Sequence, residues 1–429
     1  MRTMHIGILG CGTVGTGVVR LLKNNARKHT QYTQAGLEVS RILVNDPGKS
    51  RDPVIHPDLL TTNPDDILED PSIDIVVEVM GGTGLARDYI LRALKAGKNV
   101  VTANKDLMAQ DGEELFREAA RYDVDLFFEA SVAGGIPIIG PLKNSLAANR
   151  ITKVMGIING TTNFILTKMY EDGSEFGDVL KLSQELGYAE TDPTADIEGW
   201  DAGRKIAILA SIAFNTRVNF KDVYMEGITK ISSLDIEYAK KLNCTIKLVG
   251  LATERDGQVE ARVHPVLLPM AHPLAKVDGV YNAVYVEGDA VGDVMFQGQG
   301  AGEMPTASAV VGDILNVARN EVKGVSPREN CSCYDQKEIL PIERTVDKYF
   351  IRMTVVDRPG VLSQISGVFG QKDVSIDSLI QTKHSEGSAE LALITDDVID
   401  ANLHAALDEI QHLEPVMAIS SVIRVEKDS

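Results

Sequence analysis

The stretch HIGILGCGTVG, residues 5–15, decides how the first part of the chain folds. It begins with a short apolar run typical of a buried strand, and a helical pattern starts at Val14. Between them, three glycines with the spacing G-x-G-x-x-G permit a tight turn, a close approach to a phosphate and close helix packing. A purely structural glycine turn is the alternative, but the position after a first strand favours dinucleotide binding. The residues expected to contact the dinucleotide are Gly10, Gly12, Thr13, Val14 and Gly15.

The pattern continues outward from this loop as an alternation of strands and helices. Further strands are predicted at residues 37–44, 73–80, 99–104 and 124–130, and helices at 14–22, 87–96 and 113–121. Alternating strands and helices predict a parallel sheet covered by helices on both faces. We therefore expect a Rossmann-type nucleotide-binding domain over residues 1–135.

The remainder of the chain predicts two further domains. Residues 136–302 mix helical and strand patterns, which indicates an α+β domain, expected to serve substrate binding, catalysis and dimerisation. The helix at 303–321 is expected to pack back on the first domain. Residues 322–346 are polar and lack a clear period, as in a linker. Residues 347–429 show a βαββαβ order, which predicts a small ferredoxin-like domain. The fold class is α/β overall.

Composition excludes several classes of protein. The 429 residues carry a formal net charge of −18, which argues against a nucleic-acid or anionic-membrane partner. No apolar run reaches the length of a membrane span, and the N-terminus lacks a signal-peptide pattern, so a cytoplasmic location is expected. Four cysteines form no disulfide framework. Cys331 and Cys333 are expected to be free thiols in a loop, with a metal or redox role as the weaker alternative.

An unusual concentration of carboxylates precedes one lysine. ETDPTADIEGWDAGRK, residues 190–205, carries acids at Glu190, Asp196 and Asp201 before Lys205, which opens an apolar helix. Asp201 and Lys205 share a helix face, because they are four residues apart. A solvated surface pair is the alternative. A lysine at the edge of a buried helix and beside acids is better placed to act as a proton donor, with the acids recognising a cation.

Three other motifs lie at positions where ligands bind. Lys105 follows the strand at 99–104, at the edge where open α/β sheets bind ligands; a surface lysine is the alternative. Gly160 and Thr161 open a helix and are expected to bind a carboxylate, unless they form an ordinary cap. The turn EASVAGGIPI, residues 129–138, could present carbonyl oxygens to a monovalent cation, or be a plain strand-end turn. Together these features describe an amino-acid substrate reduced or oxidised at its side chain.

The motifs resemble those of the homoserine dehydrogenase family with a C-terminal ACT regulatory domain, and they follow that family's order. They are GxGxVG at 10–15, TANK at 102–105, EASVAGGIPI at 129–138, GIINGTTNFIL at 156–166 and GYAETDPTADIEGWDAGRK at 187–205. The resemblance covers essentially the whole chain, and the last two motifs are very specific.

The resemblance implies roles for individual residues. It makes Lys205 the proton donor, Glu190 and Asp201 substrate-binding residues, and Lys105 a residue between cofactor and substrate. Asp196 joins the substrate-binding acids, and Asp201 also orients Lys205. Gly187 and Gly302 match glycines near the cofactor. The sodium site of the family matches the backbone around Glu129, Val132, Gly134 and Ile136.

The implied reaction is the reversible reduction of L-aspartate 4-semialdehyde to L-homoserine, in threonine, methionine and isoleucine biosynthesis. Hydride moves from the nicotinamide to the aldehyde carbon while Lys205 protonates the oxygen. Asn45 stands where many NADP-preferring members carry arginine, and Lys49 and Arg51 follow it, so we expect both NAD and NADP to be used. The resemblance also implies a homodimer or homotetramer, and inhibition by L-threonine through the ACT domain.

Two rival functions remain. Aspartate-semialdehyde dehydrogenase needs a thiol nucleophile, but Cys11 lies inside the glycine loop and no other cysteine lies in a substrate motif. A nucleotide-sensing regulator would bind the dinucleotide without turnover and would give Lys205 no role.

Overall fold

The computed structural model describes residues 2–325, 331–385 and 387–427, which divide into two compact units. Unit 1 comprises Met1–Val154, Ala207–Phe220 and Asn282–Gln336, and unit 2 comprises Met155–Ile206, Lys221–Tyr281 and Lys337–Ser429. The domain boundaries predicted after residues 135, 302 and 346 stay predictions. Among the described residues, no helix combines the length and the apolar character that crossing a membrane requires.

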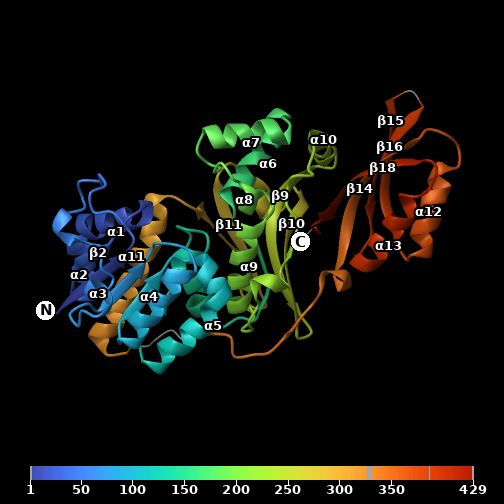
Figure 1. Cartoon of the computed structure of the whole chain (residues 1–429). Helices are drawn as coiled ribbons and strands as arrows, with labels where there is room; N and C mark the ends of the chain where they lie inside the picture. Colours follow the sequence, from blue (N-terminus) through green and yellow to red (C-terminus); the bar gives the residue numbers. More distant parts are fainter. Residues whose placement is uncertain (1, 326–330, 386, 428–429) are drawn as a thin grey trace. The chain divides into compact units, whose positions relative to one another are not determined.

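A parallel sheet organises unit 1 (Figure 1), and its strands lie in the order β3-β2-β1-β4-β5-β6. The strands are β1 Thr3–Leu9, β2 Gly36–Leu43, β3 Leu60–Thr61, β4 Ile75–Glu78, β5 Asn99–Thr102 and β6 Leu126–Phe127. Every pair is parallel, and the order reverses between β1 and β4. Ligands of such sheets bind beyond the carboxyl ends of the strands at this reversal. The Rossmann-type sheet predicted from the sequence is confirmed.

The helices of this sheet explain the spacing of the motifs. They are α1 Thr13–Asn24, α2 Ala26–Thr33, α3 Asp65–Leu68, α4 Gly84–Lys95, α5 Lys105–Arg121 and α11 Glu303–Lys323. Helix α5 begins eight residues before the start predicted at residue 113. The side chain of Asn104 caps it by accepting a hydrogen bond from the backbone N–H of Leu107 at 3.1 Å. Lys105 is therefore the first residue of a helix.

Helix α11 packs against α1 in unit 1 although the two are far apart in the sequence. A Cβ atom on Gly17 would lie 2.9 Å from Cβ of Ala307, so only a glycine lets the helices approach this closely. Val310 and Ile314 are fully buried in the same apolar cluster as Ile6 of β1. Unit 1 also holds β12 Gly292–Gln299, β11 Tyr281–Gly288 from Asn282 onward and the first part of β7 Ile151–Ile157, in the order β12-β11-β7.

Unit 2 is built on a long hairpin. Strands β9 Cys244–Arg255 and β10 Gln258–Pro269 pair antiparallel along their whole lengths. Asp256 and Gly257 join them with φ of 54° and 79°, the left-handed pair that two-residue hairpin loops favour. The helices of this part are α6 Gly160–Asp172, α7 Phe176–Glu185, α8 Thr194–Ile197 and α10 Ser233–Lys241, and α9 Trp200–Ala213 begins in unit 2.

The C-terminal part of unit 2 is the predicted βαββαβ domain. Its elements are β14 Val346–Val356, α12 Val361–Gln371, β15 Ile376–Ser385, β16 Ser388–Thr395, α13 Asp400–Ile410 and β18 Val416–Val425. The strand order is β18-β14-β16-β15, and all neighbours are antiparallel. Figure 1 shows α12 and α13 on one face of this sheet. Buried side chains such as Ile351, Ile365 and Leu403 form its core.

The stretch predicted as a linker, residues 322–346, carries structure of its own. Helix α11 extends to Lys323, and β13 Glu338–Ile339 pairs in parallel with β10. The backbone N–H of Asp335 donates to the carbonyl of Asn215 at 2.8 Å. These contacts are made by two- or three-residue segments that are too short to show a periodic pattern.

Candidate active site

The glycine loop has the geometry of a phosphate cradle. Gly10 adopts φ of 105°, and a Cβ atom on Gly15 would lie 2.4 Å from the carbonyl oxygen of Gly10. Around Gly12, by contrast, a Cβ atom would have no neighbour within 4 Å. Gly12 is also the N-cap of α1 and makes no side-chain cap, so the first N–H groups, at Thr13 and Val14, lie at an exposed helix end. The residues present therefore fit the pyrophosphate of a dinucleotide.

A buried glutamate, which the sequence analysis did not identify, organises the edge of the sheet next to this loop. Glu78 ends β4, and its carboxylate accepts hydrogen bonds from the N–H groups of Met80 at 2.9 Å and Gly81 at 3.0 Å. Its other oxygen accepts from the hydroxyl of Thr102 at 2.6 Å. The side-chain amide of Asn104 donates to the carbonyl of Gly82 at 2.7 Å. These contacts hold together the loops after β4 and β5, including the one that presents Lys105.

Lys105 lies at a helix end that carries partial positive charge. It is the first residue of α5, where the partial positive charge of the helix end costs about 0.3–1 kcal/mol for a nearby positive side chain. The side chain is half-buried. A lysine kept at such a position suits contact with an anionic or electron-rich ligand.

Gly302 lies beside the first turns of α1. It is the N-cap of α11 with φ of 122°, and the next residue, Glu303, forms an ion pair with Arg20 of α1. A Cβ atom on Gly17 would lie 2.9 Å from the carbonyl oxygen of Glu303. The structure thus brings Gly302 to the helix that begins at the glycine loop.

The loop after β2 contains the residues considered for cofactor preference. Asn45 and Lys49 are exposed. The guanidinium of Arg51 donates to the carbonyl of Asp46 at 2.6 Å and to the carbonyl of Lys49 at 2.9 Å. The side chain of Arg51 therefore stabilises the conformation of its own loop by binding two of the loop's backbone carbonyls.

Glu129, expected at a sodium site, stabilises a turn through its side chain. Its carboxylate accepts hydrogen bonds from the N–H groups of Ile138 at 2.5 Å, Ile139 at 2.7 Å and Gly140 at 2.7 Å. Among the described residues no group of three or more His, Cys, Asp or Glu side chains could hold a metal ion. Any cation there would rest on backbone carbonyls, at Glu129, Val132, Gly134 and Ile136.

Unit 2 brings a lysine and two carboxylates together through one asparagine. Nζ of Lys205 donates to Oδ2 of Asp201 at 2.6 Å and to the carbonyl of Ile158 at 2.8 Å. The amide of Asn159 donates to Oδ1 of Asp196 at 2.6 Å and to Oδ2 of Asp201 at 2.9 Å. We call Asn159, Asp196, Asp201 and Lys205 the lysine cluster. The side chains of Lys205 and Asp201 are only 12% and 11% exposed, so solvent screens their ion pair weakly.

Asn159 has a second role in the lysine cluster, because it also caps α6. Its Oδ1 accepts from the N–H of Thr162 at 2.9 Å. The cap fixes the asparagine, and this in turn fixes how its amide faces the two carboxylates. Sequence reasoning identified the NGTTN turn but did not single out Asn159, whose position before a helix is the signal that could have found it.

Burial changes the protonation of one member of the lysine cluster. Burial raises the pKa of Asp196 above its usual value, against the hydrogen bond from Asn159, and the Asp201 carboxylate raises it further. A carboxyl with a raised pKa beside an ion pair is typical of functional sites.

Two of the remaining predicted site residues begin α6, and two others, the substrate residue Glu190 and the cofactor residue Gly187, follow α7. The hydroxyl of Thr161 donates to the carbonyl of Tyr188 at 2.7 Å, and Gly160 is the first residue of the helix. Glu190 is exposed, and its carbonyl accepts a hydrogen bond from Gln184 at 3.0 Å. Gly187 is exposed, with φ of 77°.

Comparisons with known proteins agree on one family. Family models described as homoserine dehydrogenase NAD binding domain, homoserine dehydrogenase and ACT domain match residues 10–129, 137–315 and 349–414. A homoserine dehydrogenase from Bacillus subtilis is 42% identical, over 99% of both chains. The solved structure of one from Thiobacillus denitrificans is 42% identical with a TM-score of 0.95, covering 99% of both chains. A hyperthermophilic archaeal homoserine dehydrogenase, solved in complex with NADPH, is 27% identical with a TM-score of 0.64, covering 77% of this chain and 99% of its own.

Proposed function

The chain belongs to the homoserine dehydrogenase family, and from that membership we propose that it interconverts L-aspartate 4-semialdehyde and L-homoserine with either NAD or NADP. The observation that carries the assignment of the chemistry to residues is the lysine cluster. It combines a cationic acid with carboxylates suited to an ammonium group. The glycine loop of unit 1 supplies a cradle suited to the dinucleotide.

Lys205 is the proposed proton donor in the reducing direction. An ammonium group has three N–H groups, and the bonds to Asp201 and Ile158 occupy two of them. The third is directed to the carbonyl oxygen of the aldehyde, where negative charge develops. Asp201 holds the ammonium charged and oriented. General acid catalysis of this kind contributes about 10²–10⁴-fold.

The other residues of the site bind and position the substrate. Asp196 and Glu190 are proposed to bind the substrate ammonium group, and the first N–H groups of α6, at Gly160 and Thr161, its carboxylate. Lys105 is proposed to stabilise the developing charge from the cofactor side. Residues 10–15, Gly187 and Gly302 are proposed to bind the reduced nicotinamide cofactor, which would supply the hydride.

The experiment that tests this function is a spectrophotometric assay of homoserine-dependent reduction of NAD⁺ and NADP⁺, followed separately. We expect turnover with both. Lys205→Met should lower kcat by about 10²-fold or more while leaving the fold and cofactor binding intact. Lys181→Met, which changes an exposed lysine of α7, is the matched control and should behave as wild type.

Two outcomes would count against the proposal. Binding of the dinucleotide without turnover would support the nucleotide-sensing rival. Near-normal kcat in a folded Lys205→Met variant would remove Lys205 from the mechanism while leaving the family reaction in place.

The ACT domain is proposed to bind L-threonine as an inhibitor. A pocket in it is lined by residues 355–362 together with Gln381 and Leu391. Within it, α12 begins after Gly360, which has φ of 90° and makes no side-chain cap, so the first N–H groups of this helix face a ligand carboxylate. Asp357 lies in the same pocket and is exposed, which suits the ligand ammonium group. ACT domains commonly pair with a second copy, and a homodimer or homotetramer is proposed accordingly.

The threonine assignment is tested in the full-length enzyme. Asp357→Asn should weaken inhibition by threonine about tenfold, since a charged hydrogen-bond partner is lost, without changing uninhibited kcat. Asp373→Asn changes an exposed acid at a left-handed position that asparagine tolerates, and should leave inhibition unchanged. A wild-type enzyme that ignores millimolar threonine would overturn the assignment.

A further inference from the structure

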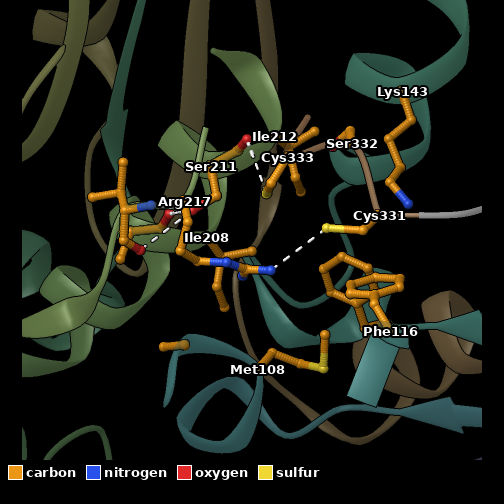
Figure 2. A pocket seen from close by; sticks show the side chains of 14 residues that line it. Met108, Phe116, Lys143, Ile208, Ser211, Ile212, Arg217, Cys331, Ser332 and Cys333 are labelled. Atoms are coloured by element: carbon orange, nitrogen blue, oxygen red, sulfur yellow. Dashed lines mark hydrogen bonds between the residues drawn. The ribbon is translucent and has the colours of Figure 1, made fainter. Parts of the chain in front are cut away.

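A cavity within unit 1 brings the two cysteines of residues 331–333 beside two basic side chains (Figure 2). Its walls come mainly from α5, the part of α9 in this unit and the segment around residue 217. They are largely apolar, and Phe116 and Phe128 meet edge to face with centroids 5.5 Å apart. The centres of water-sized molecules have about 20 Å³ in the cavity, which is enough for one or two small molecules.

The segment with the two thiols is held in a defined conformation. The N–H of Tyr334 donates to the carbonyl of Ser332 at 3.1 Å, which closes a tight turn at Cys333. The side-chain amide of Asn215 donates to the same carbonyl at 3.1 Å. Sγ of Cys333 lies 3.6 Å from the carbonyl oxygen of Ser211 on α9. These contacts hold the backbone between the two cysteines and the sulfur atom of Cys333 in place.

Cys331 has the surroundings of a reactive thiol. Nη2 of Arg217 donates to its Sγ at 3.5 Å, and Figure 2 shows Lys143 on the opposite side of the cysteine. A hydrogen bond from the Cys333 side chain lowers the pKa of Cys331 to about 6, against burial, and Arg217 and Lys143 lower it further. The same contact raises the pKa of Cys333. Cys331 is thus the thiol of the pair that ionises more easily, and Cys333 stays protonated to higher pH.

We propose that Cys331 and Cys333 are a peroxide-sensitive thiol pair, in which Cys331 is oxidised first and Cys333 then closes a disulfide with it. The Cys331 thiolate attacks one oxygen of hydrogen peroxide; the O–O bond breaks, a sulfenic acid forms and hydroxide leaves. The Cys333 sulfur, losing its proton, attacks the sulfenic sulfur; the S–S bond forms, the S–O bond breaks and a second hydroxide leaves. In sum, two thiols and one peroxide give one disulfide and two waters.

The geometry permits the second step. Two residues of chain span at most about 7 Å, so even an extended segment keeps the Cα atoms of Cys331 and Cys333 close to the upper end of the roughly 4.4–6.8 Å found between Cα atoms of disulfides. Both thiols line the same cavity, one residue apart in the chain. Of the two other cysteines, Cys244 is buried with its Sγ donating to the carbonyl of Leu242, and Cys11 lies in the glycine loop.

The test treats the full-length protein with hydrogen peroxide and follows thiols by mass spectrometry. Trypsin releases residues 329–337, which contain both cysteines, as one peptide. We expect this peptide to lose two hydrogen masses at low peroxide excess and to recover on reduction. Without peroxide, Cys331 should react with iodoacetamide at pH 7 at least about tenfold faster than Cys244, because its thiolate fraction is larger.

Variants separate the two steps. In Cys333→Ser, oxidation of Cys331 should stop at a sulfenic acid that dimedone traps. In Cys331→Ser, Cys333 should stay reduced, and Arg217→Met should slow oxidation several-fold. Cys244→Ser is the matched control and should oxidise as wild type. The proposal is overturned if the peptide keeps both thiols while Cys11 or Cys244 is oxidised, or if Cys331→Ser leaves Cys333 equally reactive.

Discussion

At the scale of single residues, Asp196 links the proposed substrate site to stability. Burial raises its pKa, so its carboxyl costs folding free energy once it is ionised. A folded-state pKa above the unfolded value contributes stability below the ordinary pKa, and that contribution is lost as pH rises through the raised pKa. The ionised form of this half-buried carboxyl, which is proposed to bind the substrate ammonium, therefore lowers the stability of the protein.

Asp196→Asn should consequently raise Tm at neutral pH while it weakens homoserine binding. Asparagine keeps an oxygen for the hydrogen bond from Asn159 but does not ionise. The gain in Tm over wild type should grow as pH rises from about 4 to about 7. Thermal unfolding across this range, together with KM for homoserine, checks both effects.

Asp192 is a control for this argument, because its pKa is shifted in the opposite direction to that of Asp196 in the same loop. The hydroxyl of Thr194 lowers the pKa of this exposed carboxyl by donating a hydrogen bond to it. The contribution of this carboxylate to stability is present above the ordinary pKa and is lost as pH falls through the lowered pKa. Asp192→Asn should therefore lower Tm slightly at neutral pH and lose this effect in acid. A gain in Tm that is independent of pH in Asp196→Asn would refute the burial argument.

Asn45 is the residue at which cofactor preference is best tested. It is exposed at the carboxyl end of β2, while the nearby Arg51 is engaged by backbone carbonyls of its own loop. Asn45→Arg should raise the NADP/NAD ratio of kcat/KM by about tenfold, because a guanidinium pairs with the 2′-phosphate. Separate kinetics with each cofactor measure the ratio. An unchanged ratio would place that phosphate elsewhere.

At the scale of elements, the glycines in the turn from β1 into α1 differ in how much space surrounds them. Gly15→Ala would place a Cβ atom 2.4 Å from the carbonyl oxygen of Gly10, so the loop must shift and Tm should fall by several degrees. Gly12→Ala meets nothing within 4 Å and should leave Tm nearly unchanged. It should still raise KM for the cofactor about tenfold or more, because the methyl group enters the space of the pyrophosphate.

Thermal unfolding and cofactor kinetics on this pair of variants distinguish the two roles. If Gly12→Ala binds both cofactors as tightly as wild type, the open space at Gly12 is not the phosphate site. If Gly15→Ala is as stable as wild type, the close approach of helix and loop contributes less to stability than the geometry indicates.

At the scale of the whole molecule, buried ion pairs join the ACT part of unit 2 to its other elements. Arg352 of β14 donates to Asp235 of α10 at 2.9 Å and to Glu390 of β16 at 2.6 Å, and all three side chains are at most 7% exposed. Arg262 of β10 donates twice to Asp347 of β14 at 2.6 Å. β10 and β18 also pair in parallel.

Arg352→Met should lower the free energy of unfolding by about 3–5 kcal/mol, because it leaves two buried carboxylates without their cation. Arg344→Met removes an exposed ion pair with Glu338 and should cost less than about 1 kcal/mol. Urea denaturation of both variants makes the comparison. Equal losses of unfolding free energy would show that the buried ion pairs of Arg352 stabilise the protein no more than the exposed pair of Arg344 does.

The same contacts decide how the proposed inhibition by threonine can be tested. A chain that ends near Thr345 lacks β14 and β18, so Asp235 and Arg262 lose partners and β10 loses a neighbouring strand. Such a chain should be less stable as well as insensitive to threonine. Point variants in the pocket of the full-length chain, such as Asp357→Asn, avoid this double effect.

The sequence by itself determined features that depend on near neighbours in the chain. The spacing of Gly10, Gly12 and Gly15 after an apolar run predicts the loop and its sheet, and βαββαβ periodicity predicts the last domain. The i,i+4 spacing of Asp201 and Lys205 predicts their ion pair, which the structure contains at 2.6 Å. Turn geometry and helix periodicity act over a few residues, so a linear pattern is enough to read them.

Only the tertiary structure decided which distant groups meet. Asn159 joins Asp196 to Asp201 from about 40 residues away, and Arg217 approaches Cys331 across more than 100 residues. Glu78 and Thr102 meet because β4 and β5 are adjacent, and β13 pairs with β10 although neither strand indicates the other. Such contacts arise because packing buries separate apolar faces together, and each buried polar group then needs a partner that its own sequence neighbourhood does not contain.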